Sequence, residues 1–255
     1  MRSLAWTICL ALFLSGVSPG QNQTSKPPAA PPAKQKPAPG FIDRVLKYLG
    51  ISDSPGTLKG PGDEVVHGEI WVADLNSNTT HVFAKGSYRS PVFMTGNKSV
   101  LALSGTDLIQ FPAGSGEGKK LYSIPGITKL VGSSSEESDN LLLLRSNGAD
   151  SHPQVSSISI NTGKITPVNY DPASSADLQM VENLESWTRS YGDKQVYVRR
   201  QTKHALSGTV EWSDVFLKTA GHDAVNVSRC DGANCGQPSL SSDGQLLIFV
   251  KAEPE

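Results

Sequence analysis

Two cysteines near the end of the chain, Cys230 and Cys235, could bind a metal or form a disulfide. Structural zinc needs four ligands, commonly from two matched pairs, and the sequence has no second pair to match this one. The third cysteine, Cys9, lies in an apolar N-terminal run that is typical of an export signal. In an oxidising compartment the two remaining thiols pair with each other. We therefore predict a local Cys230–Cys235 disulfide, with modest stabilisation because the closed loop is short.

Other patterns that resemble catalytic or ligand-binding motifs fail on their context. Residues 16–20 have the Gly-x-Ser-x-Gly spacing of a hydrolase nucleophile, but they lie in the N-terminal run, which cannot form a strand-turn-helix elbow. Residues 114–118 are Gly-rich, but no Lys-Ser or Lys-Thr follows, as a phosphate-binding loop requires. The five histidines never occur at metal-ligand spacing. We predict no catalytic residue, no cofactor and no metal.

Composition narrows the class of protein further. Lys and Arg total 23 against 24 for Asp and Glu, a formal charge of -1, so no bulk charge attracts nucleic acid. The 24 Gly and 17 Pro interrupt helices and favour turns, which indicates many short elements. After an export signal and a linker, the 255 residues leave chain for one ordinary domain.

The first 64 residues are predicted to lie outside that domain. Arg2 followed by an apolar run over residues 4–17 predicts a signal peptide at 1–20, cleaved after Gly20. The alternative is an uncleaved anchor, although no charged stop-transfer pattern follows the run. After cleavage no membrane span remains, so we expect a periplasmic or secreted protein.

Three further segments precede the domain. Residues 21–40 are polar and rich in Pro, which predicts a disordered linker. Residues 41–50 have apolar side chains at helical spacing and end in Gly50, which predicts a short amphipathic helix. Residues 51–64 are predicted to be a second flexible linker.

The region from residue 65 to the end alternates short apolar runs with turn residues, as stacked antiparallel strands do. Its four strongest runs begin at positions 100, 141, 196 and 246. These spacings are close to or above the roughly 40 to 45 residues of a propeller blade. A turn rich in Gly, Ser, Asn or Asp precedes each run, so each run is predicted to be the second strand of a unit of four.

The two ends of this region complement each other. Residues 69–75 and 81–83 match the third and fourth strands of a unit, whereas residues 238–250 match only the first and second strands. Pairing the two ends would leave no exposed sheet edge between them. We therefore predict an all-β fold, a small β-propeller of about four blades of four antiparallel strands. The N-terminal third and fourth strands would close it by pairing with the C-terminal first and second strands.

Two segments carry a family resemblance. Residues 238–250, with the turn Ser242-Asp243-Gly244, resemble the strand-turn-strand signature of WD40-like, TolB-type β-propeller repeat proteins of the bacterial envelope. Residues 68–75 are similar to the third strand of that repeat. The resemblance implies an interaction scaffold in the cell envelope.

A predicted binding site follows from the propeller geometry. Four polar side chains fall at comparable positions before or in the predicted first strands, where the loops surround a central channel: Arg89, Lys129, Glu185 and Gln237. Ordinary surface charge is the alternative explanation for them.

The functional prediction is an exported, non-enzymatic β-propeller scaffold that binds a protein, peptide or glycan partner. The alternative is a hydrolase or lyase whose catalytic residues converge from separate blades, and a structure would reveal them as a buried cluster. The oligomeric state stays open.

Overall fold

The computed structural model describes residues 65–253, apart from 115, 134–138, 147–152, 172 and 207. These residues belong to one compact unit, Pro39–Glu255. The predicted signal peptide (1–20), the Pro-rich linker (21–40), the amphipathic helix (41–50) and the second linker (51–64) all lie outside the described residues.

The fold is built almost entirely of β-strands, as predicted. One α-helix, α2 (Ser175–Glu185), and a short 3₁₀ turn at Thr95–Asn97 accompany them in the described part of the chain. The strands are β1 (Gly68–Asp74), β2 (Thr79–Phe93), β3 (Ser99–Ser104), β4 (Asp107–Pro112), β5 (Lys119–Ser123), β6 (Ile127–Ser133), β7 (Asn140–Arg145), β8 (Gln154–Ser159), β9 (Ile165–Pro167), β10 (Arg189–Tyr191), β11 (Lys194–Ala205), β12 (Gly208–Thr219), β13 (Val225–Asn226), β14 (Asn234–Leu240) and β15 (Leu246–Ala252).

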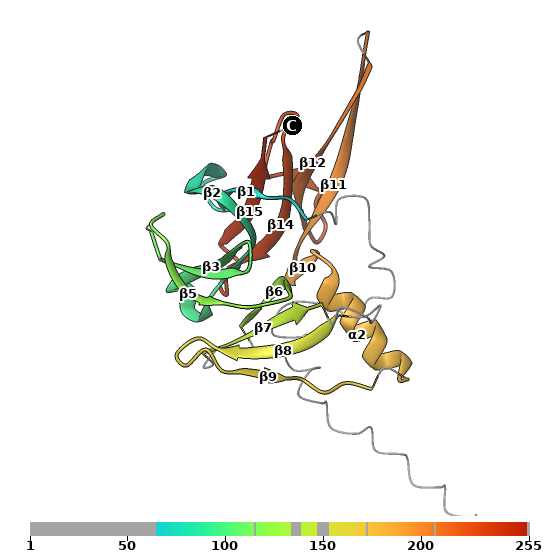
Figure 1. Ribbon diagram of the computed structural model, residues 1–255. Helices are drawn as coiled ribbons and strands as arrows, with labels where there is room; N and C mark the ends of the chain where they lie inside the picture. The colour runs from blue at the N-terminus through green and yellow to red at the C-terminus, as the bar shows by residue number, and fades with distance from the viewer. Residues whose placement is uncertain are drawn as a thin grey trace, which may run out of the picture. The chain divides into compact units, whose positions relative to one another are not determined.

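These strands form three antiparallel sheets (Figure 1). The largest has seven strands in the order β14-β15-β1-β2-β3-β4-β5. The other two have four strands each, β6-β7-β8-β9 and β10-β11-β12-β13. Within both four-stranded sheets the spatial order follows the chain order, so each is a meander of hairpins.

The first and last strands of the fold pair with each other. β1 runs antiparallel to β15 over six residue pairs, from Glu69↔Lys251 to Asp74↔Leu246. The backbone N–H of Leu75 extends the pairing by donating to the Gln245 carbonyl at 2.9 Å. This contact confirms the predicted pairing of the two ends, and it covers a sheet edge on each of them.

The prediction of four separate blades closed into a ring is wrong, because β2 belongs to two of the predicted units. It is one strand of 15 residues that pairs with β1 through its first part and with β3 through its last part. A bulge between Arg89 and Val92 bends the strand, and Ser90 has a φ of 51° there. Two predicted units therefore merge into the seven-stranded sheet, and the sheets do not close a four-bladed propeller.

The hairpin that leads into β15 shows how turn residues set this register. Asp243 accepts hydrogen bonds from the Ser241 hydroxyl at 2.6 Å and from the Gln245 backbone N–H at 3.0 Å. Gly244 has a φ of 64°, a conformation that glycine adopts without strain. The Ser241 hydrogen bond, followed by the Gln245 N–H, lowers the pKa of the Asp243 carboxyl, although partial burial opposes the shift.

The core lies between the sheets. Leu101 and Leu103 on β3 and Leu108 on β4 pack in one cluster with leucines of the β6-β7-β8-β9 sheet, including Leu130 and Leu141. A second cluster joins Val196 and Val215 to residues of β14 and β15. Each four-stranded sheet therefore buries one face against the seven-stranded sheet.

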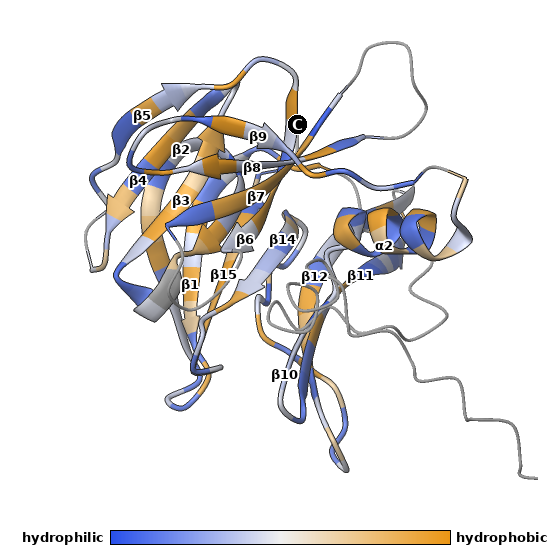
Figure 2. Ribbon diagram, turned by 90° about the horizontal axis from the view of Figure 1, so that it is seen from below, coloured by the Kyte–Doolittle hydropathy of each residue, from blue (hydrophilic) through white to orange (hydrophobic). Residues whose placement is uncertain are grey.

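Helix α2 is a feature that the sequence analysis did not predict. Ser174 caps its N-terminus by accepting a hydrogen bond from the Asp177 backbone N–H. Apolar and polar stripes alternate along it (Figure 2). Met180, Val181 and Leu184 are buried against apolar side chains of the β6-β7-β8-β9 sheet. No helix among the described residues is long and apolar enough to cross a membrane.

Candidate functional site

Arg89, the first of the four predicted binding residues, is 8% exposed on β2. Its guanidinium donates hydrogen bonds to the carbonyls of Gly105 at 3.1 Å and Ile127 at 3.0 Å, and also to the carbonyl of Thr128. Burial lowers the pKa of Arg89 from its usual value, but an arginine stays charged in proteins. Arg89 therefore joins β2 to the turn after β3 and to the start of β6.

Lys129, on β6, is 5% exposed. Its ammonium donates to the carbonyls of Glu185 at 2.6 Å and Ser186 at 2.7 Å. It also lies 3.6 Å from the centre of the Trp187 ring, a cation–π contact. The structure thus brings Lys129 and Glu185 together, through the backbone of Glu185, at the point where α2 ends.

Gln237, on β14, is 0% exposed. Its amide oxygen accepts a hydrogen bond from the Ser90 backbone N–H at 2.5 Å, and its amide nitrogen donates to the Val66 carbonyl at 2.6 Å. Because Ser90 follows Arg89, the bulge of β2 is fixed from one side by Gln237 and from the other by Arg89. Buried polar groups require such partners, so these contacts have a structural role.

These positions differ from the open channel mouth that the sequence suggested. The charged or amide ends of Arg89, Lys129 and Gln237 bind backbone groups of other segments of the chain, whereas Glu185 is partly exposed. Partner binding by these four residues stays a prediction. The burial of Arg89, Lys129 and Gln237 could not be read from the sequence, because their carbonyl and N–H partners lie in distant segments of the chain.

The Cys230–Cys235 disulfide is confirmed. The two cysteines are bonded, with their Cα atoms 6.2 Å apart; Cys230 lies in the loop that enters β14, and Cys235 lies at the start of β14. The carboxylate of Asp214 on β12 organises this loop. It accepts hydrogen bonds from the Cys230 backbone N–H at 2.7 Å, the Ser228 hydroxyl at 2.9 Å and the Trp212 indole N–H at 2.9 Å. The disulfide therefore holds the start of β14 against β12.

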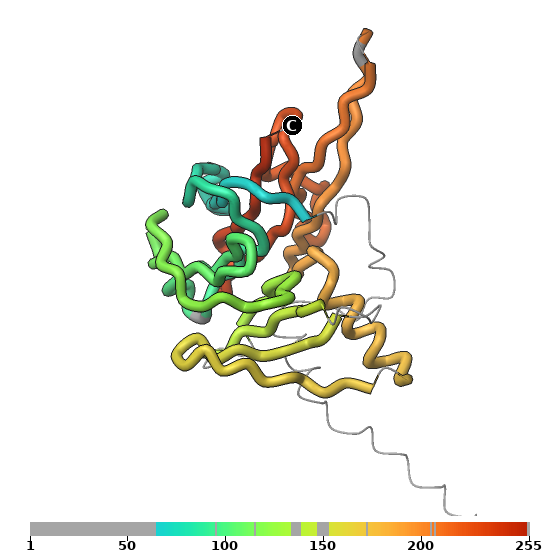
Figure 3. The backbone as a smooth tube through the Cα atoms, in the orientation of Figure 1, coloured from blue at the N-terminus to red at the C-terminus, as the bar shows by residue number. Residues whose placement is uncertain are grey.

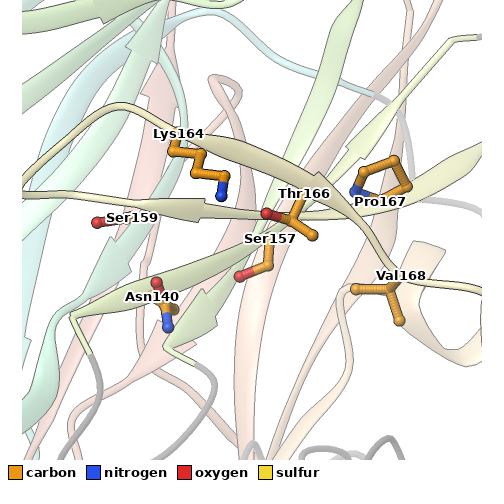
Figure 4. Close-up of a pocket in the computed structure, with 7 residues that line it drawn as sticks. All are labelled: Asn140, Ser157, Ser159, Lys164, Thr166, Pro167 and Val168. Carbon is orange, nitrogen blue, oxygen red and sulfur yellow. The ribbon is translucent and has the colours of Figure 1, made fainter.

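A pocket of about 450 Å³ lies on the β6-β7-β8-β9 sheet. Figure 4 shows its side chains along β8, β9 and the start of β7. Most of the lining residues that the structure describes are of polar type, and none of these is a carboxylate: Asn140, Ser157, Ser159, Lys164, Thr166, Pro167 and Val168. The sequence analysis missed this pocket. The signal that could have indicated it is the set of hydroxyl residues at positions 157, 159 and 166, because residues two apart in a strand lie on the same face of the sheet.

The hairpin of β11 and β12 is a second surface feature that the sequence analysis missed. Its strands pair over twelve residue pairs, and the outer part projects beyond the neighbouring strands (Figure 3). We call residues 199–212 the arm. Most of the described side chains in the arm are exposed, and Leu206 at its turn is fully exposed. The predicted strands near 196–199 and 213–217 are the two ends of this hairpin next to the body.

Clusters that could do chemistry are scarce in the part of the chain that the structure describes. No group of three or more His, Cys, Asp or Glu side chains there could hold a metal ion. In the described part of the chain, the candidate features are therefore the buried polar side chains that link neighbouring segments, the pocket on the β6-β7-β8-β9 sheet, and the projecting arm.

Comparisons with known proteins identify related structures but no sequence family. No protein-family model matches the sequence, and no curated protein matches it. Solved structures do match. A protein assigned to TolB from Agrobacterium tumefaciens has a TM-score of 0.43 and 12% identity, covering 75% of this chain and 100% of that chain.

Two further structures are similar to a lesser degree. TolB from Acinetobacter baumannii has a TM-score of 0.36 and 13% identity, covering 72% of this chain and 49% of that chain. The tricorn protease has a TM-score of 0.30 and 11% identity, covering 73% of this chain and 20% of that chain. The predicted resemblance to TolB-type proteins is thus confirmed among solved structures.

Proposed function

We propose that this chain is an exported, non-enzymatic binding protein of the cell envelope that holds a protein partner through the arm. Export is supported by the signal-like residues 1–20 and by the Cys230–Cys235 disulfide, which suits an oxidising compartment. The observation that carries the binding role is the arm, a hairpin that extends from the body and exposes apolar side chains.

The apolar side chains of the arm are available for contact. Leu206 has a relative exposure of 112% and Val210 of 50%. Val210 pairs with Lys203, and Trp212 pairs with Gln201, so Val210 and Trp212 lie on one face of the hairpin. Burying one such aliphatic side chain fully in a partner would contribute about 1.5 to 3 kcal/mol.

The arm adds almost nothing to the core of its own protein. Only Gln201 and Trp212 are partly buried among its described side chains. An isolated two-stranded hairpin is marginally stable in water, because few contacts offset the entropy of ordering it. The arm is therefore better explained as a contact element than as a source of stability.

The charge of the arm favours an acidic partner surface. It carries Arg199, Arg200 and Lys203 against Glu211, a balance of three positive charges to one negative, on a chain with a formal charge of -1. Arg200 and Glu211 lie 3.7 Å apart as an exposed ion pair. Opposite charge on a partner would speed association and set its orientation.

Backbone groups provide a second means of contact. β10 pairs only with Lys194–Val196 of β11, so no described strand pairs with the outer edge of β11 beyond Val196. β13 pairs with β12 only at Phe216 and Leu217. Both edges of the arm can therefore accept a strand of the partner.

Site-directed photocrosslinking tests the proposal. A photoreactive phenylalanine derivative replaces Leu206, and a matched variant carries it at Val225, which is 51% exposed on β13 outside the arm. We expect a discrete crosslinked protein from position 206 in intact cells and none from position 225. Mass spectrometry then identifies the partner, whose contact surface should be acidic. Equal crosslinking at both positions, or none at 206, would refute binding through the arm.

A further inference from the structure

The pocket on the β6-β7-β8-β9 sheet lies where α2 stops covering that sheet. On this face β7 presents Leu142 and Leu144 under the helix but Asn140 beyond it. β8 changes from Val155 to Ser157 and Ser159 in the same direction. All belong to one face, because the register pairs Asn140 with Ser159, Leu142 with Ser157, and Leu144 with Val155.

The third strand of this face follows the same change. Val168 packs against the helix-covered apolar cluster, whereas Thr166 pairs with Ser157, and the Lys164 carbonyl accepts from the Ser159 backbone N–H at 3.0 Å. On this face of the sheet, the side chains of β7, β8 and the β9 segment thus change from apolar to polar at the same level. The polar half is a defined surface rather than scattered exposed residues.

The hydrogen-bonding capacity of this surface is largely unused. Within the described residues, the side chains of Ser157, Ser159, Lys164 and Thr166 make no hydrogen bond or ion pair. Three hydroxyls can each donate and accept, and the ammonium supplies three donors. Because none of the described lining residues is a carboxylate, the Lys164 charge favours an anionic ligand.

The size and the apolar part of the pocket narrow the ligand further. A volume of about 450 Å³ lies within the range of small-molecule sites. Pro167 and Val168 offer an apolar surface beside the hydroxyls. This combination suits a molecule with several hydroxyls, one apolar C–H face and one negative charge.

We propose that this pocket binds a sugar acid of about one hexose in size. The carboxylate of the ligand meets the Lys164 ammonium. Its ring hydroxyls exchange hydrogen bonds with Ser157, Ser159 and Thr166, and its C–H face lies on Pro167 and Val168. The site is independent of the arm, so neither proposal depends on the other.

Calorimetric titration of the purified protein with three probes tests this site. D-glucuronate carries both the charge and the hydroxyls, D-glucose only the hydroxyls, and acetate only the charge. We expect saturable binding of D-glucuronate, at least tenfold tighter than that of either other probe. No saturation with D-glucuronate up to about 20 mM, or equal affinity for acetate or for D-glucose, would overturn the proposal.

Variants locate the binding. Lys164→Met removes the charge but keeps a stem of similar length, and Thr166→Val removes one hydroxyl at nearly constant shape. We expect at least a tenfold loss of D-glucuronate affinity for Lys164→Met and a severalfold loss for Thr166→Val. The control Lys218→Met, at an exposed lysine on β12, should bind within twofold of the unmodified protein. Equal affinities of Lys164→Met and Lys218→Met would place any binding elsewhere and overturn the proposal.

Discussion

Arg89→Met tests whether the buried guanidinium stabilises the fold by linking β2 to other segments, or whether it binds a partner. Methionine keeps most of the apolar stem, so the change removes mainly the hydrogen bonds to the carbonyls of Gly105, Ile127 and Thr128. Hydrogen bonds to a charged group contribute roughly 1.5 to 3 kcal/mol each, and three from one side chain are not additive. We expect the free energy of unfolding to fall by about 2 to 4 kcal/mol.

Thermal and urea unfolding measure this loss. For a domain of this size about 1 kcal/mol corresponds to roughly 2 to 4 °C, so the melting temperature should fall by about 4 to 16 °C. The matched control is Arg229→Met, because the Arg229 side chain is exposed and the change should cost less than about 0.5 kcal/mol.

Two results would refute the structural role of Arg89. One is a melting temperature for Arg89→Met that matches that of Arg229→Met. The other is unchanged stability together with lost partner crosslinking, which would make Arg89 the binding residue that the sequence suggested. A loss of stability with crosslinking retained at position 206 would support both the structural role of Arg89 and partner binding through the arm.

Three further predictions concern stability. Lys129→Met should lower the free energy of unfolding by about 1 to 3 kcal/mol and change the environment of Trp187. Urea unfolding followed by tryptophan fluorescence measures both effects, and an unchanged unfolding midpoint would contradict this prediction. Replacing both Cys230 and Cys235 by Ser should cost about 2 kcal/mol, as the short loop implies, and a loss of 4 kcal/mol or more in urea would show a larger role. The depressed pKa of Asp243 contributes stability that is present above its unfolded pKa of about 3.9 and is lost as pH falls through the folded value. Asp243→Asn should therefore flatten the loss of stability below about pH 4 in an acid titration, whereas an unchanged slope would contradict this.

The sequence predicted those parts of the fold whose signals are local. The turn Ser242-Asp243-Gly244 and the apolar run after it identified the β14–β15 hairpin. The unmatched strands at the two ends then predicted the β1–β15 pairing, and cysteine count with spacing predicted the disulfide. For the hairpin and the disulfide the deciding residues are close in the chain, whereas the pairing of the two ends followed from counting the strands of each repeat unit.

The parts that the sequence did not predict depend on tertiary contacts. Residues 79–93 contain Gly86 and Pro91, which suggest that a strand ends there. β2 nevertheless continues through a bulge, and side-chain contacts of Arg89 and Gln237 hold that bulge in place. Helix α2 has a capping signal at Ser174, but its apolar stripe becomes meaningful only against the sheet that it covers. The arm has no core face, so its sequence carries no strong periodic signal.

The candidate functional features also depend on tertiary contacts that the sequence does not show. For the four predicted polar positions, residue type alone could not show whether the side chains face solvent or backbone carbonyls. The pocket requires three strands in register, and that register appears only when β7, β8 and β9 are assembled.

The central claim is that the arm binds the partner while the body folds without it. Partner retention by an arm-shortened variant tests this most directly. In that variant Gln201 is joined to Trp212, its pairing partner, through an Asn-Gly turn that replaces residues 202–211. We predict a melting temperature within about 2 °C of the intact protein, and loss of the partner that is crosslinked from position 206. Retention of that partner by the folded, shortened protein would contradict the account.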